Sequence, residues 1–167
     1  MNTSHASTIL RDHDSARRDS VPVRAAQLLA RGPARMTSPA ARWAVTVLAV
    51  AGAALMVWSG VIHLQLWSDG YRSISVIGPL FLIQGIASIA LAAVIAVFRR
   101  VAVLAAGAVT MAATAAGLLL SVNVSLFGFR ESLAVPNAMS SLVVEFAGAA
   151  VLAAAAALVL AASPVRR

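Results

Sequence analysis

The stretch WAVTVLAVAGAALMVWSGVIHLQLW, Trp43–Trp67, decides the fold class of this 167-residue chain. It contains no charged residue and is longer than the roughly 20 apolar residues that a helix needs to cross a bilayer. It is also too long to be the apolar core of a cleaved signal peptide. A tryptophan stands at each end, as indole rings do at membrane interfaces. The stretch therefore predicts a transmembrane helix.

Three further apolar runs predict three more spans, at residues 79–98, 101–126 and 138–162. The second run is apolar from Ile74, but proline fits only the first turn of a helix, so we expect that helix to begin near Pro79. A kinked helix from Ile74 is the alternative. Short loops between the spans favour an all-α polytopic membrane protein, an up-down-up-down four-helix transmembrane bundle over residues 43–162.

Composition supports a membrane class and excludes several chemistries. Hydrophobic residues make up 60% of the chain and charged residues only 11%, against about 25% charged in soluble domains. Without cysteine there is no thiolate metal site, and without lysine no Schiff base can form on a side chain. One membrane histidine does not suffice for a haem with two axial histidines. No hydrolytic triad order appears, so we expect no enzyme activity and no cofactor.

The arginines predict the orientation. Seven lie in residues 1–42, two follow Phe98 and two end the chain, whereas the other two loops hold only Arg72 and Arg130. The positive-inside bias then places both termini in the cytoplasm of a multi-pass protein of the cell (plasma) membrane. The formal charge of +7 thus reflects topology, and we expect no nucleic-acid partner. The bias to Ala, Val and Arg suggests a bacterial gene.

The ends of the chain are polar. We expect residues 1–42 to form a disordered basic cytoplasmic tail, because they cannot bury enough apolar area to offset ordering entropy. Residues 23–31 could form a short amphipathic turn on the membrane surface. Short isolated helices are marginally stable, so we expect this segment to fray instead. Translation could start at Met1 or at Met36, which lies shortly before the first span, and the sequence leaves both alternatives open. Residues 163–167 are a cytoplasmic end.

The most polar membrane residues fall at one depth. His63 lies about 6 Å inside the outer end of its span, Gln84 about 7–8 Å and Glu145 about 10–11 Å, at 1.5 Å per residue. All three therefore belong to the outer leaflet. Three serines belong to the same layer: Ser59, Ser88 and Ser141.

An ionised carboxylate in hydrocarbon costs at least about 2.5–3.5 kcal/mol, so Glu145 needs a partner or a wet cavity. We expect His63 and Glu145 to converge in an outward-facing polar pocket, with Gln84 and the three serines as hydrogen-bonding neighbours. Such a pocket suits binding or transport of a small ligand, an ion or a proton. A purely structural role, above all for Gln84, stays open.

Small residues predict how the helices associate, because lipid supplies no hydrophobic drive between them. Gly, Ala, Ser and Thr recur at steps of three and four in each span, which favours close packing. The alanine row Ala149, Ala153, Ala157 and Ala161 lies beside this face in the last span. It could contact a second copy or a larger complex as well as the lipid bilayer. The alternative function is accordingly a non-catalytic accessory subunit of an envelope or respiratory complex.

Several short motifs at the outer end resemble a known group. They are HLQLW (His63–Trp67), GYR (Gly70–Arg72), IGPLFL (Ile77–Leu82) and FGFRE (Phe127–Glu131). With them the chain resembles small four-span integral membrane proteins of actinobacteria, over roughly residues 43–162. The resemblance implies a four-span unit and draws attention to the outer mouth, but that group has no known activity to transfer.

Overall fold

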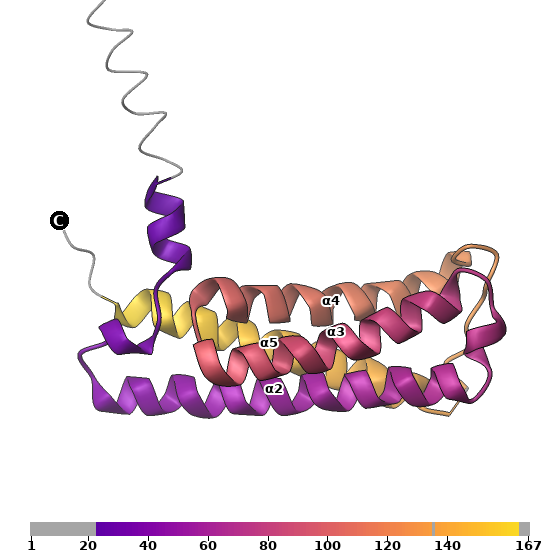
Figure 1. Cartoon of the computed structure of the whole chain (residues 1–167), viewed down its shortest axis with the longest axis horizontal. Helices are drawn as coiled ribbons and strands as arrows, with labels where there is room; N and C mark the ends of the chain where they lie inside the picture. The colour runs from indigo at the N-terminus through magenta and orange to yellow at the C-terminus, as the bar shows by residue number, and fades with distance from the viewer. Residues whose placement is uncertain (1–22, 135, 164–167) are drawn as a thin grey trace, which may run out of the picture.

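Four long helices build the protein in the computed structural model, which describes residues 23–134 and 136–163 (Figure 1). They are α2 (Pro39–Ser68), α3 (Ile77–Phe98), α4 (Val101–Val124) and α5 (Ala138–Ala162). Each is long and apolar enough to cross a membrane. The described residues contain no strand beyond one isolated bridge between Leu126 and Phe129. The prediction of an all-α four-span bundle is confirmed.

The two ends of the bundle differ. The arginine end holds the tight turn at Arg99 and Arg100, and in Figure 1 both ends of the described chain lie on this side. The loop end holds the 3-10 helix η2 (Tyr71–Ser73) between α2 and α3, and the connection at residues 125–137 between α4 and α5.

The bounds of three helices differ from the predicted spans by a few residues. α2 begins at Pro39, because Ser38 accepts a hydrogen bond from the Ala41 N–H at 3.3 Å and proline suits the first helical position. α3 begins at Ile77, two residues before the predicted start, with Pro79 still in its first turn. α4 ends at Val124 because the next residue has a φ of 64°, which cannot continue the helix.

The prediction of a disordered tail over residues 1–42 is wrong for its described part, and residues 1–22 lie outside the described residues. Residues 23–29 are helical and η1 (Pro33–Arg35) follows. The carbonyl of Arg31 accepts a hydrogen bond from the Val101 N–H at 2.9 Å, and Met36 is buried in the core. The prediction weighed only the apolar area within the tail, whereas the bundle end supplies an unsatisfied donor and an apolar surface.

Close packing joins α2 to its neighbours, as the small-residue pattern predicted. α2 lies along α3 and α5, and α4 lies along α5, while α3 and α4 touch much less. At the α2–α3 crossing, a Cβ added to Gly60 would lie 2.9 Å from the Gly85 carbonyl oxygen. Gly117 on α4 is different, because a Cβ there would meet nothing within 4 Å.

These two glycines yield a matched stability test. Gly60→Val should lower the apparent melting temperature of the detergent-purified protein by about 5 °C or more, because the backbones of α2 and α3 must separate. Gly117→Val should leave it unchanged or raise it, since the added side chain enters open space and valine is the better helix former. Equal melting temperatures for the two variants would contradict the α2–α3 contact.

Candidate functional site

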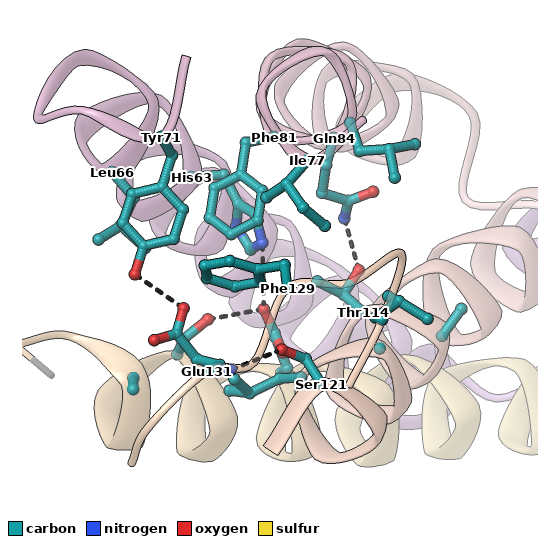
Figure 2. Close-up of a pocket in the computed structure, with 18 of the residues that line it drawn as sticks. His63, Leu66, Tyr71, Ile77, Phe81, Gln84, Thr114, Ser121, Phe129 and Glu131 are labelled. Carbon is teal, nitrogen blue, oxygen red and sulfur yellow. Dashed lines mark hydrogen bonds and ion pairs between the residues drawn. The ribbon is translucent and has the colours of Figure 1, made fainter. Parts of the chain in front are cut away.

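A cavity of about 440 Å³ lies between α3 and α4 and extends to the loop end (Figure 2). All four long helices, η2 and the 125–137 connection contribute to its walls. Leu80 of α3 and Val109 of α4 line it and are 43% and 67% exposed, so it opens sideways between these two helices. Most of its wall is apolar, and its polar groups come from a few side chains described below.

A buried carboxyl group stands at one side of this cavity. Glu145 of α5 is 0% exposed. Its Oε1 accepts a hydrogen bond of 2.7 Å from the Ser141 hydroxyl, one turn earlier on α5, and one of 3.2 Å from the Ser59 hydroxyl of α2. Its Oε2 is buried and has no hydrogen-bond partner. Half of this carboxyl group is therefore satisfied by the protein and half is not.

His63 of α2 is buried beside Glu145, with its Nε2 3.9 Å from Oε1. Its Nδ1 lies 2.8 Å from the Ser59 carbonyl oxygen, one turn earlier. A carbonyl oxygen only accepts, so Nδ1 carries a hydrogen and Nε2 is left to face the carboxyl group. His63 and Glu145 form an ion pair only when both ring nitrogens of His63 are protonated and the carboxyl group is ionised. Ser59 thus contacts both members of the pair, through its carbonyl and its hydroxyl.

Gln84 belongs to a second polar cluster. Its amide nitrogen donates to the Ser88 hydroxyl on α3 at 3.1 Å and to the Thr114 hydroxyl on α4 at 2.6 Å. Thr114 in turn donates to the carbonyl of Thr110 at 2.8 Å. Gln84 lines the cavity, and its bond to Thr114 ties α3 to α4.

Of the six predicted site residues, the structure brings four into direct contact around Glu145: His63, Glu145, Ser59 and Ser141. Gln84 bonds instead to Ser88 on its own helix and to Thr114 of α4. It still lines the same cavity as His63, Ser141 and Glu145, as the depth argument predicted. Depth along the helix did not indicate which of these polar residues bond directly to one another.

The loop end adds residues that the sequence did not assign to the site. Tyr71 of η2 donates its phenol to Glu131 Oε2 at 2.7 Å, and both side chains line the cavity. The Glu131 N–H bonds to the Ser121 hydroxyl at the end of α4, at 3.1 Å. Burial raises the pKa of the Tyr71 phenol, and the hydrogen bond and negative charge of Glu131 act in the same direction. The phenol therefore stays protonated and remains the donor.

Aromatic rings line the loop end of the cavity, beside Glu131. Tyr71 stacks on Phe81 of α3 with ring centroids 4.9 Å apart and meets Phe129 edge-on at 5.7 Å. Phe81 also lies 5.1 Å from the His63 ring. Figure 2 shows these rings gathered between Glu131 and the His63 side of the cavity. The loop end of the cavity thus holds an aromatic cluster with a carboxyl group, that of Glu131, beside it.

The charged groups of the wall are acidic. In the described part of the chain, Glu131 and Glu145 line the cavity and no arginine does. Within the same residues, no group of three or more His, Asp or Glu side chains is arranged to hold a metal ion.

Comparison with known proteins adds no family. No protein-family model, no curated protein and no solved structure matches this chain.

A double-mutant cycle on the free energy of unfolding measures how strongly Ser141 and Glu145 are coupled. Ser141→Ala should cost about 1–3 kcal/mol of unfolding free energy in detergent, because it removes the shortest bond to a buried carboxyl group. In a Glu145→Leu background the same substitution should cost less than about 1 kcal/mol, since no acid is left unpaired. Equal costs in both backgrounds would show that Ser141 acts independently of Glu145.

Proposed function

We propose that this protein binds a small amphipathic ligand in the cavity between α3 and α4, for transport or for storage, and that it is not an enzyme. The buried Oε2 of Glu145, which lacks a protein donor beside a mostly apolar cavity, carries this proposal. Ligand pockets combine such apolar walls with a few polar groups that fix orientation. An intramembrane acid commonly marks an ion, proton or ligand site.

The lateral opening indicates how a ligand enters. Leu80 and Val109 lie at the margin of the cavity on a surface that faces lipid in a bilayer. A molecule with an apolar tail concentrates in the membrane and reaches the cavity from there without crossing water. Its polar head then lies towards His63 and Glu145, and its tail towards α4.

The orientation belongs to the same proposal. Eleven of the thirteen basic residues lie in the two terminal segments and the turn at Arg99 and Arg100. By the positive-inside bias, that end faces the cytoplasm and the cavity opens in the outer leaflet of the cell membrane.

A single-cysteine experiment tests this orientation on a chain that contains no cysteine of its own. Ser75→Cys at the loop end should react with a membrane-impermeant maleimide on intact cells, whereas Thr37→Cys should react only after lysis. Both positions are exposed, so reactivity reports the side of the membrane. The opposite labelling pattern would place the cavity in the cytoplasmic leaflet and contradict the proposed topology.

Binding itself is tested with a photoactivatable dodecanol probe in lipid nanodiscs. The probe should label the cavity saturably, and Gly117→Phe should weaken it at least about tenfold by filling the open space. Val97→Phe is the control, because Val97 is exposed on α3 and does not line the cavity. Labelling that does not saturate, or that Gly117→Phe leaves unchanged, would refute the ligand site. A stoichiometric protein that co-purifies with a non-binding chain would instead favour the accessory subunit.

A further inference from the structure

We infer that the cavity selects lipophilic cations, that is, organic ammonium compounds with an apolar tail; this inference rests on the proposed function and names its ligand class. Three observations carry it. They are the two acids of the wall, the unsatisfied oxygen of Glu145, and the aromatic rings next to Glu131.

The first observation is that the charged side chains of the cavity wall are acidic. Glu131 and Glu145 line the cavity, and among the described residues no arginine lies within ion-pair distance of either. Arg130, next to Glu131 in sequence, donates instead to the Val122 carbonyl at 3.3 Å. The other titratable groups of the wall are His63, whose second proton would oppose a cation, and Tyr71, which is held as a neutral donor. An anion would therefore meet two acids and no fixed positive charge.

The unsatisfied oxygen comes second. Glu145 Oε2 is fully buried and lacks a donor, while Oε1 of the same group already accepts from two hydroxyls. A cationic head in the cavity would pair electrostatically with this carboxylate. That gain is large because charges interact strongly in a low-dielectric site. A neutral ligand could supply a hydrogen bond but no charge.

The aromatic rings come third. Tyr71, Phe81 and Phe129 pack at centroid separations of 4.9 and 5.7 Å on the mouth of the cavity, next to Glu131. Aromatic faces attract ammonium groups, and cages of such rings are the usual recognition device for quaternary ammonium. The remaining wall, with Leu80, Val109 and Leu118, is apolar and suits the tail. Carboxylates, rings and tail surface thus all favour one chemical class.

Three photoactivatable probes that share one dodecyl tail test the selection in nanodiscs. They carry a trimethylammonium, a hydroxyl or a sulfonate head. The trimethylammonium probe should bind the full-length protein at least about tenfold more tightly than the hydroxyl probe. The sulfonate probe should not saturate. If the hydroxyl probe saturates and the trimethylammonium probe binds no better, the cation inference is overturned and the ligand site stands. If no probe saturates, both the ligand site and its preference for cations are refuted.

Charge-neutral variants assign the preference to the cavity acids. Glu145→Gln and Glu131→Gln should each lower the ratio of trimethylammonium-probe to hydroxyl-probe affinity several-fold. A monodisperse size-exclusion peak for each variant reports that it is folded. Asp69→Asn is the matched control, because Asp69 is an exposed acid at the loop end that does not line the cavity. It should leave the preference unchanged. A preference that survives both glutamine variants, or that Asp69→Asn reduces equally, would overturn the inference.

Discussion

The hydrogen bonds from Ser59 and Ser141 to Glu145 join α2 to α5 at a depth where lipid offers no donor. These two bonds stabilise one oxygen of a buried carboxyl group and so favour one register of α2 against α5. His63 completes the arrangement, because its own hydrogen bond to the Ser59 carbonyl holds the ring beside the acid. One serine thereby positions both titratable groups of the bundle.

The rest of the architecture follows from which helices pack closely and which do not. Glycines bring α2 against α3, and α5 lies along both α2 and α4. α3 and α4 are joined less extensively, by the tight turn at the arginine end, by the packing of Ile95 on Gly107 and by the Gln84–Thr114 hydrogen bond. The cavity lies between these two helices, and Gly117 lines it from α4. Looser packing of one helix pair is therefore what leaves the cavity open.

Much of this was predictable from sequence, because a bilayer imposes a length and a polarity on each span. The rise per residue also placed His63 and Glu145 at similar depths, and the structure has them 3.9 Å apart. Depth does not fix rotation about a helix axis, which is why it could not show that Gln84 bonds to Ser88 and Thr114 rather than to Glu145. The Tyr71–Glu131 bond joins two loops 60 residues apart, and no periodicity governs loops. The signals available for this pair were the GYR and FGFRE motifs and the position of an acid next to a span.

The direction in which the donors point gives the cavity its chemical character. Gln84 lines the same cavity as Glu145, and both of its donor contacts go to hydroxyls, those of Ser88 and Thr114. The Tyr71 phenol donates to the other acid, Glu131. The protein thus uses its neutral donors elsewhere and leaves one buried carboxylate oxygen free. A group that enters the cavity and brings its own positive charge is the partner that this arrangement favours most.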